Sequence, residues 1–139
     1  MGEIKVKSAA MTRIGRHDAD YASLAAEAAT QALRGTDPSR IEAVFHASSA
    51  PRELCGLRDP SRVVFYAISA RTPTLRPPIQ GPFKTGGEAI YHALEFMRAA
   101  RGDVLIVGCE KMTHLDAGTA AGLLAPRVSD PVEERHGAT

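Results

Sequence analysis

The chain has 139 residues, of which 24% are charged, and its formal net charge is +1 at pH 7. This length suits one domain with a single sizeable core, and the near-neutral charge provides no basic field of the kind that holds nucleic acid. No apolar run approaches the ~20 residues of a membrane span, and no signal-peptide pattern opens the sequence. The two cysteines occur in unlike contexts, so we expect free thiols and a cytoplasmic location rather than a disulfide framework.

The first third of the chain predicts a strand, a helix and a second strand. Residues 4–8 (IKVKS) alternate between apolar and polar side chains, which is typical of an edge or half-buried strand. Either Asp18 or Asp20 can cap an alanine-rich helix over residues 21–34. Residues 41–46 form the second predicted strand, and the order of these elements favours a right-handed parallel crossover.

The middle of the chain, residues 48–82, is interrupted by prolines. Residues 63–69 (VVFYAIS) are rich enough in β-branched and aromatic side chains to predict a third strand. Residues 50–61 are too interrupted for a good helix. Residues 72–82 are predicted to form an extended loop, because each proline removes a backbone donor and favours extended geometry in the preceding residue.

The most regular stretch, residues 83–113, predicts a helix followed by a buried strand. Thr85 and Glu88 have the spacing of a capping box at a helix start. The helix then carries an apolar stripe made of Ala89, Ile90, Ala93, Leu94 and Met97. Gly102 is expected to end the helix in the left-handed conformation. Residues 103–109 (DVLIVGC) form an almost uninterrupted apolar run, which suits a central strand covered on both faces.

The remaining residues complete one predicted α/β domain over residues 1–139. Residues 1–113 are expected to form its core, and residues 114–139 a small helix and a tail. The small helix is expected near residues 117–124, where small and apolar side chains dominate, and the polar stretch SDPVEERHGAT follows it.

Two blocks of this sequence resemble the N-terminal half of a thiolase of the sterol-carrier-protein type or its archaeal-like relatives. The first is residues 11–46; the second is residues 83–113, with a T-G-G turn, an amphipathic helix, the strand DVLIVG and then Glu-Lys-Met-Thr. The resemblance implies half of a thiolase-type layered domain, with a mixed sheet of about four strands and two or three helices. It also implies that the half carrying a thiolase's proton-shuttling histidine and second cysteine is absent.

The turn departs from the family at the residue that does the chemistry. In thiolases this turn begins with the nucleophilic cysteine that carries the acyl group, and Phe83 occupies that position here. Phenylalanine cannot form a thioester, so we expect no catalytic residue in this chain. The resemblance implies substrate binding by Phe83, Thr85, Gly86 and Gly87, and Phe83 is hypothesised to fill the former acyl channel. His46 joins them as a predicted binding residue, because open sheets bind ligands at the carboxyl ends of their strands.

Other reactive side chains have simpler interpretations. Cys109 belongs to the buried strand and is expected to be structural, and nothing near Cys55 suggests an activated thiol. Glu88, His92 and Glu95 recur on one helix face and are metal-ligand residue types. Flexible carboxylates and one histidine more often form a solvated face, so no metal and no cofactor are expected.

Three functions remain open from the sequence. The first is a non-catalytic pseudoenzyme subunit of acyl-CoA and lipid metabolism, in a homo- or hetero-oligomer with a thiolase or a second thiolase-like chain. The second is an acyltransferase or thiolase activity completed by residues from a partner, and the third is a free-standing binding module with no acyl-CoA role. The first is favoured because half of a thiolase should expose an apolar face or sheet edge. A coenzyme A thioester is its possible ligand, and neither nucleic acid nor a membrane is expected as a partner.

Overall fold

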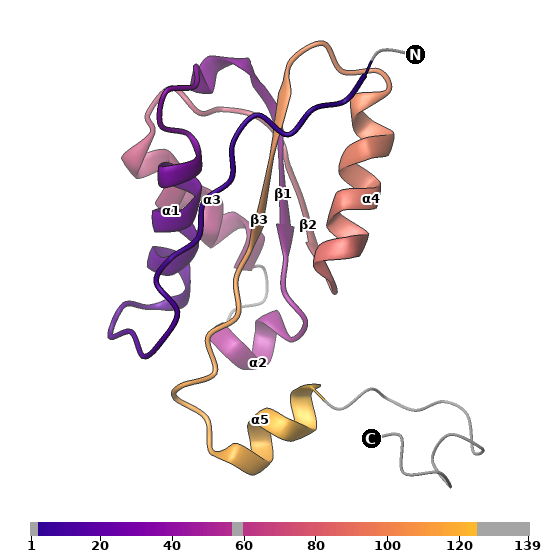
Figure 1. Cartoon of the computed structure of the whole chain (residues 1–139). Coiled ribbons are helices and arrows are strands. Elements are labelled where there is room, and N and C mark those ends of the chain that lie inside the picture. The colour runs from indigo at the N-terminus through magenta and orange to yellow at the C-terminus, as the bar shows by residue number, and fades with distance from the viewer. Residues whose placement is uncertain (1–2, 57–59, 125–139) are drawn as a thin grey trace, which may run out of the picture.

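The computed structural model of the chain describes residues 3–56 and 60–124, and Figure 1 shows a sheet with helices on both faces. In chain order the elements are α1 (Tyr21–Ala32), the 3₁₀ turn η1 (Pro38–Arg40), β1 (Ile41–Ala47), α2 (Pro51–Cys55), α3 (Pro60–Arg71), β2 (Ile79–Phe83), α4 (Gly86–Met97), β3 (Asp103–Gly108) and α5 (Ala117–Leu124). None of the helices described here is long and apolar enough to cross a membrane. The α/β class predicted from the sequence is confirmed.

The sheet of the described residues has three parallel strands in the order β2-β1-β3. The expectation of a mixed sheet of about four strands, with only two or three helices, is therefore wrong for this part of the chain. After β2 the chain crosses through α4 to the far side of β1 and continues as β3. Such a change of direction creates a crevice at the carboxyl ends of the strands, which is where ligands bind in open α/β sheets.

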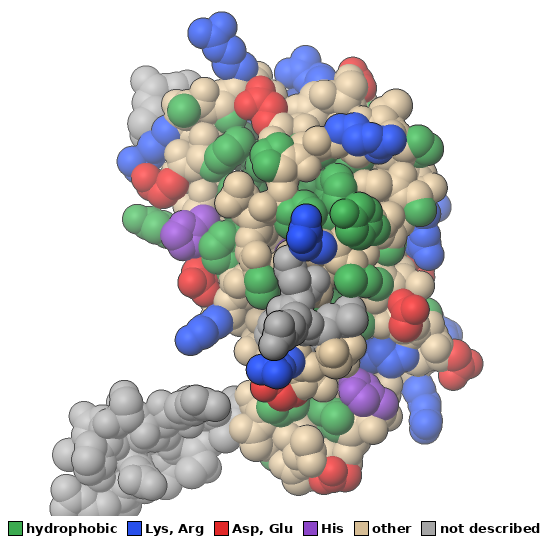
Figure 2. Space-filling view, turned by 180° about the vertical axis from the view of Figure 1, so that it is seen from behind, with side chains coloured by type: hydrophobic (Ala, Val, Ile, Leu, Met, Phe, Trp, Pro, Cys, Tyr) green, Lys and Arg blue, Asp and Glu red, His purple; other side chains and the backbone are tan. Residues whose placement is uncertain are grey.

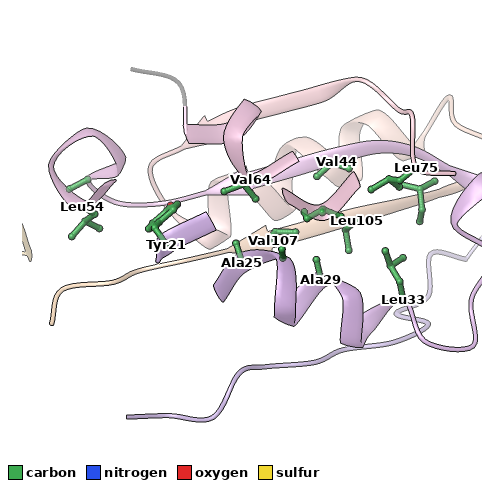
Figure 3. Packing of buried hydrophobic residues seen from close by; sticks show 14 residues of the cluster. Tyr21, Ala25, Ala29, Leu33, Val44, Leu54, Val64, Leu75, Leu105 and Val107 are labelled. Carbon is green, nitrogen blue, oxygen red and sulfur yellow. The ribbon is translucent and has the colours of Figure 1, made fainter. Parts of the chain in front are cut away.

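Side chains of β1 point alternately to the two faces of the sheet and contribute to a separate hydrophobic core on each face. Val44 lies with Leu105 and Val107 in the core that α1 and α3 cover (Figure 3). Phe45 lies in the core that α4 covers with Ala89 and Ala93. Because successive side chains of a strand point to opposite faces, the central strand must be apolar on both. Small alanines on α1 and α4 allow both helices to approach the sheet closely.

The predicted strand over residues 63–69 is wrong, because these residues belong to helix α3. The β-branched and aromatic composition favoured a strand, yet the buried side chains follow helical spacing: Ser61, Val64 and Ile68 are each at most 2% exposed. Packing of this face against α1 and the sheet outweighs the weak local preference. The preceding helix, α2, has five residues, with Pro51 at its start and Gly56 ending it in the left-handed conformation.

The predicted loop over residues 72–82 is wrong in its last part, because β2 forms at Ile79–Phe83. Pro82 argued against a strand in the sequence, because proline has no backbone N–H to donate to a hydrogen bond between strands. In this fold β2 lies at the edge of the sheet, which is a position where a strand tolerates proline.

The predicted first strand, residues 4–8, has no strand structure. Lys7 ties this segment to Asp103 at the start of β3, with Nζ 2.7 Å from the carboxylate. No ladder forms beside this tether, and Val6 remains 89% exposed. The strand β3 is where the sequence predicts it, but it is an edge strand and not a central one, so Ile106 is 39% exposed.

Both predicted helix starts are confirmed, and the predicted end of α4 is not. Asp20 is the residue that caps α1, because its carboxylate accepts the Ser23 N–H. The helix α4 ends at Met97, and Gly102 is not in the left-handed region. Its role is close approach: a Cβ at Gly102 would lie 2.3 Å from the carbonyl oxygen of Arg40. The predicted small helix is confirmed as α5, while the tail over residues 125–139 lies outside the described residues.

Charged side chains of both signs are mixed on the surface shown in Figure 2, with hydrophobic side chains exposed between them. This distribution agrees with the formal net charge of +1. On that face we find no extended field of a single sign that would attract a polyanion.

Candidate functional site

The start of α4 is held by side-chain caps. Thr85 is the N-cap residue, and its hydroxyl oxygen accepts the N–H of Glu88 at 3.0 Å. The Glu88 carboxylate accepts the N–H of Lys84 at 2.9 Å, one residue earlier than in a standard capping box. Gly86 and Gly87 then form the first turn, where backbone N–H groups have no partner within the helix.

This helix start opens onto a shallow hollow of about 250 Å³ at the carboxyl ends of β1 and β3. The hollow is lined by Ala47, Ser48, Lys84, Thr85, Gly86, Gly108, Cys109 and Glu110. Of the predicted binding residues, Thr85 and Gly86 belong to this lining. Gly87, Phe83 and His46 lie outside it. Sequence analysis missed Lys84, Ser48 and Glu110, because these residues meet only when three strand ends come together.

Phe83 belongs to an aromatic stack between the sheet and α4. Its ring centroid lies 4.8 Å from that of His92 and 5.9 Å from that of Phe45, with ring planes within 21° of parallel in both pairs. The side chain is partly buried and does not point into solvent. The ring thus holds β2 to α4, and a contact between Phe83 and substrate remains a prediction.

His46 is fully buried on the face of β1 that packs towards α1 and α3. Its Nε2 lies 3.1 Å from the Tyr21 hydroxyl, and its Nδ1 lies 3.5 Å from the Ser61 hydroxyl. Burial raises the pKa of the Tyr21 phenol far above its ordinary value, so the hydroxyl stays protonated. This polar group joins α1, β1 and α3 beneath the surface.

Cys109 is the thiol nearest to the start of α4, and it lines the hollow. Burial, together with the neighbouring Glu110 carboxylate, raises the pKa of this thiol to about 12. The Sγ–H donates to the carbonyl oxygen of Tyr21 at 3.4 Å. Because the thiolate is the nucleophilic form, a thiol that stays protonated at neutral pH is a poor replacement for a catalytic cysteine.

The charged pair after β3 ties this strand to two other parts of the fold. Glu110 accepts hydrogen bonds from the Ser49 N–H and the Ser48 hydroxyl, which lie just after β1. Lys111 Nζ donates to the carbonyl oxygens of His17 and Ala19 in the turn before α1. The sequence signal for this role was a pair of opposite charges directly after a buried apolar run.

Within the described part of the chain, no group of three or more His, Cys, Asp or Glu side chains is arranged to hold a metal ion. The three residues of α4 that the sequence suggested as metal ligands have separate structural roles. Glu88 caps the helix, His92 stacks on Phe83, and Glu95 pairs with Arg98 at 3.1 Å.

The hollow brings together groups of both charge signs, since the Glu110 carboxylate lines it together with Lys84 and the start of α4. The first turn of α4 and the Lys84 ammonium supply positive electrostatic potential. The hydroxyl groups of Ser48 and Thr85 are both engaged, the first as a donor to Glu110 and the second as the helix cap.

The chain was compared with known proteins at three levels. No family model matches it, and no match was found among curated proteins or among solved structures. The resemblance to thiolases consequently remains a prediction drawn from residues 11–46 and 83–113.

Proposed function

We propose that this chain is a non-catalytic, thiolase-like subunit that assembles with a thiolase or a second thiolase-like chain. In that assembly it contributes to the binding of an acyl-CoA thioester and uses no other cofactor. The cytoplasm is the proposed location, in keeping with its two free thiols. The observation that carries the proposal is an apolar surface on α4 and β3 that the described residues leave uncovered.

We call Ile90, Leu94 and Ile106 the α4–β3 apolar surface. Their exposed fractions are 49%, 40% and 39%. On α4 the buried Ala89 and Ala93 face the sheet, and the two exposed residues each follow one of them. His92, at the side of the helix towards β2, stacks on Phe83, so Ile90 and Leu94 lie on the side towards β3.

Ile106 extends this surface onto the sheet. It lies on the same face of β3 as Val104, which packs in the core under α4. Covering apolar area stabilises an assembly by about 25 cal/mol per Å². Monomeric proteins rarely leave extended apolar patches open, so a surface of this kind favours a protein partner.

The site chemistry supports a non-catalytic role. Phe83, at the position that the resemblance assigns to the nucleophile, stacks on Phe45 and His92. Cys109, the thiol closest to α4, has a pKa raised to about 12. What remains is a hollow in which Lys84 and the N-terminus of α4 are proposed to hold a phosphate group of coenzyme A, with the Glu110 carboxylate also in the lining.

The experiment is the solution mass of the purified chain, measured by light scattering, alone and after co-expression with the product of its neighbouring gene. A stable complex that loses its partner on the double change Ile90→Glu and Leu94→Glu supports the proposal. Tyr66→Glu is the matched control, because Tyr66 is 64% exposed on α3, at the other face of the sheet. A monomer that does not bind this gene product contradicts the proposal and favours a free-standing module.

A complex must then be tested for coenzyme A binding and for thiolysis. Binding of coenzyme A by the complex, lost on Lys84→Glu, supports the acyl-CoA role. Thiolysis that depends on a residue of this chain would contradict the proposal that the chain is non-catalytic.

A further inference from the structure

A second hollow lies at the opposite end of the sheet, where the strands begin. It is open to solvent and has a volume of about 440 Å³, within the range of roughly 300–1,000 Å³ typical of small-molecule sites. Its lining consists of Pro38, Ser39, Ile41, Glu42, Thr74, Arg76, Pro77 and Phe96. These residues come from η1, the start of β1, the connection before β2 and the end of α4, so the folded chain is needed to assemble them (Figure 1).

Two opposite charges line this hollow without pairing with each other. Both carboxylate oxygens of Glu42 accept the N–H of Arg101, at 3.1 and 3.3 Å. Arg76 Nη1 donates to the carbonyl oxygen of Leu75 at 2.8 Å. Within residues 3–56 and 60–124, neither side chain takes part in an ion pair. Most of the guanidinium donors of Arg76 and part of the acceptor capacity of Glu42 therefore stay available.

The fold fixes the position of Glu42, whereas Arg76 is exposed and its guanidinium is held by one hydrogen bond. A Cβ at Gly102 would lie 2.8 Å from Glu42 Oε1, which means that the carboxylate rests directly against the backbone there. Arg76 directly follows Leu75, whose side chain is fully buried. Groups that are held before the ligand arrives lose less conformational entropy on binding.

Apolar side chains form part of the wall of the hollow, alongside Ser39 and Thr74. Ile41 is 8% exposed at the start of β1. Phe96 packs edge-to-face on Phe45, with ring centroids 5.8 Å apart. Pro38 and Pro77 add rings with fixed backbone geometry. An apolar ligand group of modest size can lie against this wall.

We propose that this hollow binds a small zwitterion with an apolar body, and specifically an α-amino acid with an apolar side chain. Its carboxylate pairs with Arg76, its ammonium pairs with Glu42, and its side chain lies against Phe96 and the prolines. Planar guanidinium suits a carboxylate because it can donate two parallel hydrogen bonds. Glu42 disfavours dianions and Arg76 disfavours simple cations, so the charge pair selects for a ligand with both signs. This binding site is independent of the proposed subunit role.

The test is a titration of the full ¹⁵N-labelled chain with L-phenylalanine, followed by amide chemical shifts. Two matched probes carry one charge each: 3-phenylpropionate lacks the ammonium group, and 2-phenylethylamine lacks the carboxylate. We expect saturable shifts at residues 38–42 and 74–77, and affinity at least about fivefold weaker for either probe. No saturable shift, shifts elsewhere only, or equal affinity for all three compounds would overturn the proposal.

Single substitutions test the contribution of each charge to binding separately. Arg76→Gln and Glu42→Gln should each weaken L-phenylalanine binding by about fivefold or more. The glutamine at position 42 retains an oxygen that can accept the Arg101 N–H, and Arg76 is exposed, so both variants should fold. Arg52→Gln removes a charge from α2, away from the hollow, and should change nothing. Unchanged affinity in a folded Arg76→Gln variant contradicts the assignment.

Discussion

The ring of Phe83 stacks on the imidazole of His92, with ring centroids 4.8 Å apart and ring planes 19° apart. The same ring stacks on Phe45 of the central strand. Phe83 therefore bridges β1, β2 and α4. Under the proposed resemblance to thiolases this is the position of the nucleophile, and its role here is packing.

Removing this ring should destabilise the fold without any effect on chemistry. Phe83→Ala should lower the free energy of unfolding by about 2–3 kcal/mol, somewhat less than for a fully buried phenylalanine. His92→Ala removes only the exposed partner of the stack and should cost about 1 kcal/mol or less. Urea denaturation of the two variants measures the difference. Equal losses would mean that the ring does not bridge the elements.

Restoring a thiol at this position should not restore catalysis. Phe83→Cys should show no burst of acyl-enzyme formation with acetyl-CoA, because the side chain points into the stack and lies outside the lining of the hollow. Mass spectrometry after incubation with acetyl-CoA detects the acyl group. Stoichiometric acetylation of the variant would mean that position 83 lies at a catalytic site, and it would contradict this prediction.

The buried polar group around His46 should contribute to stability. Tyr21→Phe removes the hydroxyl 3.1 Å from Nε2 and should cost about 1–2 kcal/mol, because a buried polar atom then loses a hydrogen-bond partner. Tyr66→Phe is the matched control, since Tyr66 is 64% exposed, and should be neutral. Thermal unfolding followed by circular dichroism compares the two. A neutral Tyr21→Phe change would show that the hydroxyl adds nothing.

Elements with local signals could be predicted from the sequence. Asp20 and Thr85 cap α1 and α4 through contacts within the first turn, so a short window of sequence contains the whole signal. β3 has an apolar run with a clear boundary at each end. The position of β3 in the sheet could not be predicted, because an edge strand and a central strand differ in which strands pair with them, and a short window of sequence does not show this.

Elements decided by tertiary packing could not be predicted. In α3, the strand-like composition of residues 63–69 masks a buried helical face at Val64 and Ile68. In β2, Pro82 is tolerated because no strand pairs beyond it among the described residues. Both answers depend on which surface each segment meets, and the local sequence does not contain that information.

The residues of the candidate site also differ in whether a local sequence signal or tertiary packing determines their place. Thr85 and Gly86 were found because they belong to one turn. His46 was placed correctly near the end of a strand, but its side chain shares the face of Val44 and is buried there. Phe45 and Ala47 lie in the opposite core, so counting alternate positions from either one places His46 on the other face.

Gly102 should be intolerant of any side chain. In Gly102→Ala the new Cβ would meet the Arg40 carbonyl oxygen at 2.3 Å and Glu42 Oε1 at 2.8 Å, so backbone must move. We expect a loss of about 1–3 kcal/mol in the free energy of unfolding. Gly108→Ala is the control, because nothing lies within 4 Å of its added Cβ. Equal stability of the two variants in urea denaturation would contradict this close approach.

Alkaline pH should destabilise the fold through Cys109. Burial raises the pKa of this thiol from 9.0 to about 12, so the folded chain holds the proton more tightly than the unfolded chain does. The stabilisation is complete below pH 9 and is lost as the pH rises from 9 towards 12. Across that window the free energy of unfolding should fall by at most about 1.4 kcal/mol per pH unit from this group. Burial of the Tyr21 phenol acts in the same direction above pH 10.

Cys109→Ala isolates the contribution of the thiol. Urea denaturation at a series of pH values from 7 to 11 should show a shallower fall in the variant than in the wild-type chain, with the two slopes equal below pH 8.5. Alkylation gives an independent readout: at pH 7.5 iodoacetamide should modify Cys109 only slowly in the folded chain, because little thiolate is present. Identical pH slopes in both proteins, with rapid alkylation of Cys109, would mean that the thiol is ionised at neutral pH. A nucleophile would then exist beside the start of α4, and the non-catalytic role would have to be abandoned.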